Sequence, residues 1–134
     1  MTGRYLLDTN ILSDLMRNPS GRVADRIAQT GGQQVCTSII VVAEIRYGIA
    51  KNRSLRLAAQ LAAILGGLEV VSFEAPADVS YSELRARLEK TGKPIGANDM
   101  LIAAHALSLG LTLVTANERE FSRVNGLSIE NWLR

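Results

Sequence analysis

The chain has 134 residues, 47% of them hydrophobic and 21% charged, which fits one folded domain, expected here over residues 1–134, and excludes a disordered or fibrous protein. Its net charge of +2 is too small to indicate a nucleic-acid partner by itself, and its single cysteine, Cys36, excludes an internal disulfide or a thiolate metal cluster. Residues 1–10 lack the apolar stretch of a signal peptide and no apolar run could span a bilayer, so we expect a soluble, cytoplasmic protein with no membrane partner.

Short apolar segments alternate with helical patterns along the chain. Strands are expected at residues 4–7, 34–36, 68–73, 111–115 and 127–130. Helices are expected at residues 11–16, 23–30, 39–51, 55–65, 76–91 and 99–109, although Ser80 and Glu83 match a capping box that leaves a later start open for the fifth. The alternation predicts an α/β fold in which helices cover both faces of a mainly parallel sheet of four to five strands.

Two aspartates stand where such a sheet places its ligands, beyond the carboxyl ends of strands or at the start of a helix. Asp8 directly follows the first strand, and Asp99 opens a helix after the segment IGAN. Either could be an N-cap residue, since aspartate caps helices well. However, Thr9 or Asn10 can cap the first helix and Asn98 the other, which leaves both carboxylates free.

Glu44 lies in the middle of the apolar helical segment IIVVAEIRYGI. Arg46 is two residues away and therefore does not share its helical face. Burying an unpaired carboxylate costs on the order of several kcal/mol unless it protonates, pairs or binds a metal. A tertiary ion pair with Arg46 or Arg53 is the structural alternative, and we favour a functional role.

A fourth polar group follows the segment LTLVTA. Asn117 stands where another strand-end acid is expected, and Glu120 could supply the charge from the next turn. We expect Glu118 to be a solvated loop residue. The only histidine, His105, lies within AAHAL on an apolar helix, so we expect it to be buried rather than to act as a general base; Cys36 is likewise expected to be buried and inert.

Convergence of Asp8, Glu44 and Asp99 would raise their pKa values by mutual repulsion. A hard divalent cation removes that penalty, and Mg²⁺ or Mn²⁺ suits oxygen ligands. A metal-activated water could then attack a phosphorus atom. The residues therefore predict a metal-dependent hydrolase of phosphodiesters.

Four segments in this order resemble the successive motifs of PIN domains, and specifically those of the VapC toxin ribonucleases: LLDTNILSDL, SIIVVAEIRYGIAK, IGANDMLIAAHAL and LVTANEREFSRV. The resemblance runs from about Tyr5 to Trp132. It implies a three-layer α/β/α fold and an endoribonuclease that depends on Mg²⁺ or Mn²⁺ and cuts RNA, often transfer RNA. It also implies a homodimer, inhibited by a VapB-type antitoxin in higher assemblies.

The resemblance also assigns residues to the site. The metal-site acids carried over by motif are Asp8, Glu44 and Asp99. The family's usual fourth acid falls at Asn117, and we take Glu120 as its substitute. Polar positions that usually hold the carboxylates or a metal-bound water correspond to Thr9, Asn10 and Thr115.

Basic residues gather in two stretches, which are either solvated helix faces or, if both flank one site, a surface for the RNA backbone. They comprise Arg46, Lys51, Arg53 and Arg56, and Arg85, Arg87, Lys90 and Lys93. Two rival functions are open. A phosphotransferase with Asp8 as covalent nucleophile would need a second aspartate at the position of Asn10. A catalytically silent RNA- or protein-binding module of the same fold would have little reason to keep three converging acids.

Overall fold

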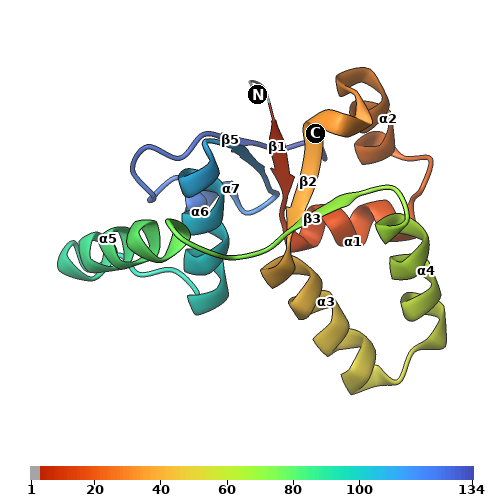
Figure 1. Ribbon diagram of the computed structural model, residues 1–134, viewed down its shortest axis with the longest axis horizontal. Coiled ribbons are helices and arrows are strands. Elements are labelled where there is room, and N and C mark those ends of the chain that lie inside the picture. The colour runs from red at the N-terminus through yellow and green to blue at the C-terminus, as the bar shows by residue number, and fades with distance from the viewer. Residues whose placement is uncertain (1–3) are drawn as a thin grey trace.

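The computed structural model describes residues 4–134 and contains one sheet of five strands (Figure 1). The strands are β1 (Tyr5–Leu7), β2 (Val35–Ser38), β3 (Glu69–Val71), β4 (Thr112–Val114) and β5 (Ile129–Glu130). Their order is β3-β2-β1-β4-β5, and every neighbouring pair is parallel. The predicted α/β fold with a parallel sheet is therefore confirmed.

The helices surround this sheet. They are α1 (Thr9–Arg17), α2 (Arg22–Thr30), α3 (Ile39–Asn52), α4 (Leu55–Leu65), α5 (Ala77–Lys90), α6 (Ala97–Leu109) and α7 (Glu118–Phe121), with a short 3-10 helix, η1 (Gly32–Gln34). In Figure 1, α1, α2 and α4 lie on one side of the strands and α5, α6 and α7 on the other, while α3 extends beyond the strand ends. No helix within residues 4–134 is both long and apolar enough to cross a membrane.

The central strands are apolar because both faces of the sheet are covered. Leu6 and Leu7 of β1 and Leu113 and Val114 of β4 are fully buried. Cys36 of β2 is buried as predicted, and its burial raises the pKa of the thiol to about 11. The thiol is therefore protonated at neutral pH, which agrees with an inert core role.

The register of the strands decides where the polar residues after them meet. Leu7 pairs with Thr37 on one side and with Val114 on the other. The residues that follow β1 and β4, Asp8 and Thr115, therefore leave the sheet at the same edge. The sequence pattern places each residue after a strand, and the parallel register brings them together.

The structure settles two helix starts for which the sequence offered alternatives. The N-cap residue of α1 is Asp8 and neither Thr9 nor Asn10, because the chain passes from β1 into α1 without an intervening loop. The helix α5 begins at Ala77 with Pro76 at its N-cap, close to the predicted start at residue 76, and the later start left open by the capping box at Ser80 is not adopted. The elements η1 and α7 were not predicted, since three or four residues are too few to display a helical period.

Candidate active site

A cleft of about 360 Å³ lies at the carboxyl edge of the sheet. Its lining residues are Asp8, Thr9, Asn10, Ser13, Arg17, Glu44, Asp99 and Asn117. The structure thus brings together all three predicted acids, from the end of β1, the middle of α3 and the start of α6. Ser13 and Arg17 are the lining residues that the sequence analysis missed.

Asp8 is held by the backbone and by two side-chain hydrogen bonds. Its N–H donates to the Val114 carbonyl at 2.9 Å, which extends the pairing of β1 with β4. The residue is 4% exposed. Its Oδ1 accepts from the Thr9 N–H at 2.8 Å, and its Oδ2 accepts from the Thr115 hydroxyl at 2.7 Å. Burial raises the pKa of Asp8, the two hydrogen bonds oppose this, and the charge of Glu44 adds to it. This carboxylate is therefore fixed in one orientation.

Thr115 connects Asp8 to the residues that follow β4. It is fully buried, and its Oγ1 donates to Asp8 while accepting from the Asn117 N–H at 2.9 Å. Nearby, Asn10 Oδ1 accepts from the Ala116 N–H at 3.3 Å. These bonds tie the segment after β4 to the start of α1.

Glu44 joins two other elements of the cleft. Its Oε1 accepts from the Thr9 hydroxyl at 2.6 Å, and its Oε2 accepts from Asn98 Nδ2 at 3.1 Å. Neither Arg46 nor Arg53 forms an ion pair with it within the described residues, so the structural alternative considered for Glu44 is not realised. Instead of an ion pair, neutral donors from α1 and α6 hold this carboxylate in the cleft.

Asp99 lies in the first turn of α6 and has a different environment. The N-cap of this helix is Gly96 and no side chain caps it, so the prediction that Asn98 caps α6 is wrong. No hydrogen bond within residues 4–134 reaches the half-buried carboxylate of Asp99. Its pKa rises to about 6, first through burial and then through the charges of Asp8, Glu120 and Glu44.

Gly96 allows Asp99 to occupy this position. A Cβ atom on Gly96 would lie only 3.3 Å from Asp99 Oδ2. A side chain at this position would therefore displace the Asp99 carboxylate slightly, while the backbone angles of Gly96 (φ −57, ψ 150) suit any residue.

Two glutamates near α7 behave differently from each other. Glu120 is close enough to Asp99 to raise its pKa but does not line the cleft, which Asn117 does. Glu118, expected as a solvated loop residue, instead accepts from Asn131 Nδ2 at 3.0 Å and pairs with Arg134, and these bonds lower its pKa. Glu118 therefore binds residues at the C-terminal end of the chain and does not line the cleft.

The donor set of the cleft suits a hard cation that keeps part of its water shell. Carboxylate oxygens predominate, and their mutual repulsion at Asp99 is the penalty that a divalent cation would remove. Within residues 4–134, however, no three His, Cys, Asp or Glu side chains stand as a group that could hold a metal ion by themselves, so Asp8, Glu44 and Asp99 share the cleft without closing around one point. Their oxygens suit Mg²⁺ or Mn²⁺, which keeps several waters, and the lining of the cleft has no His or Cys for a structural zinc site.

His105 does not take part in the cleft. It is 1% exposed, its Nδ1 lies 2.8 Å from Ser38 Oγ, and its ring packs edge-on against Phe73 at 5.2 Å. Burial lowers its pKa, so the ring is neutral at pH 7. The prediction of a buried histidine without a general-base role agrees with this position.

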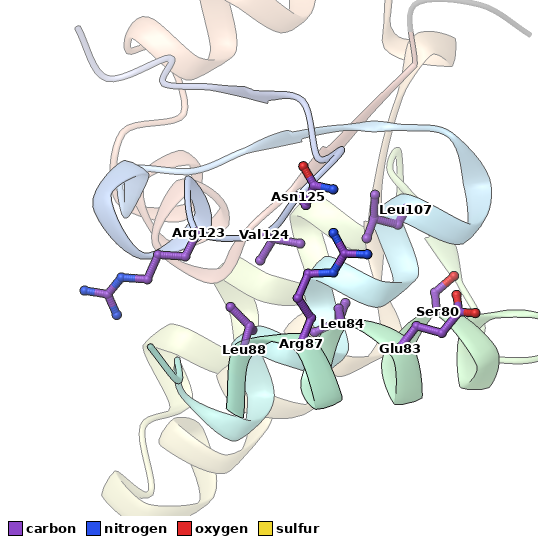
Figure 2. Close-up of a pocket in the computed structure, with 9 residues that line it drawn as sticks. All are labelled: Ser80, Glu83, Leu84, Arg87, Leu88, Leu107, Arg123, Val124 and Asn125. Carbon is purple, nitrogen blue, oxygen red and sulfur yellow. The ribbon is translucent and has the colours of Figure 1, made fainter. Parts of the chain in front are cut away.

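A second cavity, of about 250 Å³, lies between α5, α6 and residues 123–125 (Figure 2). Its lining mixes apolar side chains (Leu84, Leu88, Leu107 and Val124) with polar and charged ones, among which Glu83 is the only carboxylate. Figure 2 shows Arg87 extending toward Asn125 across this cavity. With one carboxylate it cannot hold a divalent cation as the cleft could, so the cleft is the candidate site.

The two predicted basic stretches are exposed. In the first, Lys51 lies 6.0 Å from the Tyr47 ring. In the second, Arg85 bonds Glu89 and Tyr81, which partly satisfies its guanidinium. Neither stretch lines the cleft.

The chain matches the PIN domain over residues 5–127. It is 38% identical to a protein named Ribonuclease VapC2 from Rickettsia felis over 130 residues, or 96% of this chain and 97% of that protein. It is 35% identical to a protein named tRNA(fMet)-specific endonuclease VapC from Shigella flexneri, over 96% of this chain and 98% of that one. Among solved structures, a VapBC2 complex from Rickettsia felis bound to a promoter DNA fragment contains a chain that superposes with a TM-score of 0.88 at 36% identity, covering 96% of this chain and 98% of that chain.

Proposed function

The chain belongs to the PIN domain family, and from that premise we propose that it is a VapC-type endoribonuclease that depends on a divalent cation and acts as the toxin of a toxin–antitoxin pair. One observation carries the proposal. Asp8, Glu44 and Asp99 come from three distant segments and line one cleft at the carboxyl edge of the sheet. A binding module gains nothing from this arrangement, because gathering carboxylates raises the free energy of the empty protein.

The cation is Mg²⁺ or Mn²⁺, and the residues that would hold it are Asp8, Glu44 and Asp99. When bound, it would activate a water for attack on phosphorus and stabilise charge on the phosphoryl oxygens. Asn117 lines the cleft at the position of the family's usual fourth acid, and we propose that its amide oxygen is a neutral ligand there. Glu120 does not line the cleft, but its negative charge acts on Asp99.

The chain's own polar residues keep the acids in place. Thr115 and the Thr9 N–H fix both oxygens of Asp8, and the Thr9 hydroxyl and Asn98 fix Glu44. A carboxylate with both oxygens engaged is a poor covalent nucleophile. The geometry therefore disfavours the phosphotransferase alternative and supports Asp8 as an oriented ligand.

The proposed substrate is RNA, with transfer RNA as the first class to test, since one relative is named a tRNA(fMet)-specific endonuclease. The exposed basic residues Arg46, Lys51, Arg53, Arg85 and Lys93 are proposed to contact its backbone. The proposed partners are a second copy of the chain and a VapB-type antitoxin, since similar solved structures include VapBC complexes. The proposed location is the cytoplasm, where both RNA and an antitoxin are available.

The decisive experiment incubates the purified chain with labelled transfer RNA in Mg²⁺ or Mn²⁺, and in EDTA. We expect cleavage with either ion and none in EDTA. The variants Asp8→Asn and Asp99→Asn should each lose more than about a hundredfold in rate, since they remove charge from the ligand set. Equal cleavage in EDTA would exclude the metal mechanism, and RNA that is bound but never cut would favour the silent binding module.

A further inference from the structure

The exposed face of α1 carries a polar stripe that begins in the acidic cleft. Asn10, Ser13 and Arg17 are three and seven residues apart and so lie on one side of the helix, all three lining the cleft. The opposite face buries Ile11 and Leu15 in the core. The stripe therefore leads away from the carboxylates for roughly 10 Å along α1.

Arg17 lies where the cleft meets a second groove. This groove, of about 590 Å³, surrounds the turn between α1 and α2, and its lining residues are Asp14, Arg17, Asn18, Pro19, Ser20, Gly21, Arg22 and Leu133. Because Arg17 lines both hollows, they adjoin at its side chain. The lining of the second groove is mostly polar, and it contains one carboxylate and two guanidinium groups.

The guanidinium of Arg17 is largely available to a ligand. Its ion pair with Asp14 is long, at 4.0 Å, and the same Oδ1 atom already accepts from Asn18 at 2.9 Å. The Arg17 side chain is 62% exposed. It is also the one positively charged residue that lines the cleft in the part of the chain the structure describes, and it makes no ion pair there with Asp8, Glu44 or Asp99. Neutralising the acids is therefore not its role.

We propose that Arg17 binds a phosphate of the RNA backbone beside the bond that is cut, and that the strand runs from the acidic cleft past Arg17 into the groove at the α1–α2 turn. This inference rests on the proposed function. A polyanion cannot approach three carboxylates without a compensating cation, and a planar guanidinium with five donors suits a phosphate. Arg17 is a substrate-binding residue that positions the strand and does not take part in the chemical step.

Three variants test this assignment. Arg17→Gln removes the charge, and Arg17→Lys keeps the charge but loses the planar set of donors. Arg119→Gln removes an equal charge from an exposed site on α7 that lines neither hollow and lies outside both basic stretches. Binding of a fluorescein-labelled single-stranded oligoribonucleotide is measured at several salt concentrations, in the Asp99→Asn background with Mg²⁺ so that the RNA stays intact. Cleavage by the same variants without the Asp99 change gives kcat and KM, and thermal unfolding checks the fold.

We expect Arg17→Gln to weaken binding about tenfold, since a charge-assisted hydrogen bond is lost. The slope of log affinity against log salt should become shallower by about 0.7, which corresponds to one phosphate contact on a single strand. The loss should appear in KM, with kcat unchanged. Arg17→Lys should keep the salt slope and recover only part of the affinity, whereas Arg119→Gln should change affinity less than about threefold.

Equal effects of Arg17→Gln and Arg119→Gln would overturn the assignment, because Arg17 would then contribute only diffuse charge. A loss confined to kcat would overturn it as well. The proposed function fails separately: RNA that wild type never cuts refutes the nuclease, while a specific binding loss in Arg17→Gln still upholds the phosphate contact.

Discussion

Asp8 and Asp99 line the same cleft but are held in opposite ways. Asp8 is almost fully buried at a strand end, and a backbone N–H and a threonine hydroxyl engage both of its oxygens. Asp99 is half-buried at a helix start, receives no hydrogen bond within residues 4–134, and has a pKa raised to about 6 by burial and by neighbouring acids. Hydrogen bonds therefore fix the carboxylate of Asp8, whereas the carboxylate of Asp99 stays near other acids although their charges repel it.

This difference indicates a division of labour. A fixed carboxylate sets the position of anything bound in the cleft, because it cannot move without breaking its hydrogen bonds to the Thr9 N–H and the Thr115 hydroxyl. A carboxylate without donors gains most from a bound cation, because nothing else compensates its charge. The following variants should separate the two roles.

Lengthening each carboxylate by one methylene should produce the largest contrast. Asp8→Glu cannot keep both hydrogen bonds in a closely packed corner, so we expect the rate of RNA cleavage to fall about a hundredfold. Asp99→Glu, in a more open position without donors to lose, should fall only about tenfold. Single-turnover cleavage in Mg²⁺ measures both. If the two variants lose the same amount, the difference in rigidity has no functional meaning.

Thr115→Val should weaken the fixed corner without touching any proposed ligand. It removes the hydroxyl that donates to Asp8 and accepts from the Asn117 N–H. We expect the cleavage rate to fall roughly 10- to 100-fold, as for other residues that orient metal ligands, and unfolding free energy to fall by about 1–2 kcal/mol.

Thr112→Val is the matched control for this variant. It makes the same chemical change on the same strand, where the threonine hydroxyl has no hydrogen bond within the described part of the chain. Activity and urea unfolding should both stay close to wild type. A similar loss of activity in both variants would mean that Thr115 acts only through strand stability.

Asp99→Asn should raise stability in a pH-dependent way. The carboxyl titrates near 3.8 in the unfolded chain and near 6 in the folded one, so wild type loses stability as pH rises from about 4 to about 6. The neutral amide avoids this loss. After allowance for solvent screening, we expect a gain of about 1 kcal/mol at pH 7.5 that disappears at pH 4, measured by urea unfolding in EDTA. A gain that does not depend on pH would exclude charge repulsion as the cause.

Gly96→Ala should have the smallest effect on the cleavage rate, because it removes no hydrogen bond or charge and only crowds the Asp99 carboxylate. The new Cβ would lie 3.3 Å from Oδ2, so the carboxylate must shift by a few tenths of an ångström. We expect about a threefold lower rate with a stability change below about 1 kcal/mol. Gly48→Ala in α3 is the control: its Cβ meets no atom within 4 Å, and it should leave activity unchanged. Equal rates in both variants would show that Asp99 tolerates displacement.

Much of the fold was predictable because its signals are local. Apolar runs of three to five residues, breaks at glycines and helical periodicity located all five strands and six of the seven α-helices. The candidate acids were also visible, since Glu44 interrupts an apolar helix and Asp8 directly follows a strand. These features need no knowledge of distant residues.

The capping residues and the supporting polar contacts were less predictable. Asp8, Thr9 and Asn10 could each cap α1 by sequence, and the choice depends on where β1 ends against β4. Arg17 was not predicted as part of the site, although its spacing from Asn10 on one helical face was a usable signal. It was passed over because nothing local connects an arginine at the end of α1 with a glutamate on α3.

By itself, the sequence determined the strand and helix pattern, the aliphatic core and the acids that interrupt it, because each depends on neighbours within one or two turns. Only the tertiary structure decided that Thr115 orients Asp8, that Thr9 and Asn98 hold Glu44, and that Asp99 receives no hydrogen bond in the described chain. The reason is physical: a hydrogen bond acts over about 3 Å, and residues separated by dozens of positions reach that distance only when the parallel register aligns the strand ends at one edge.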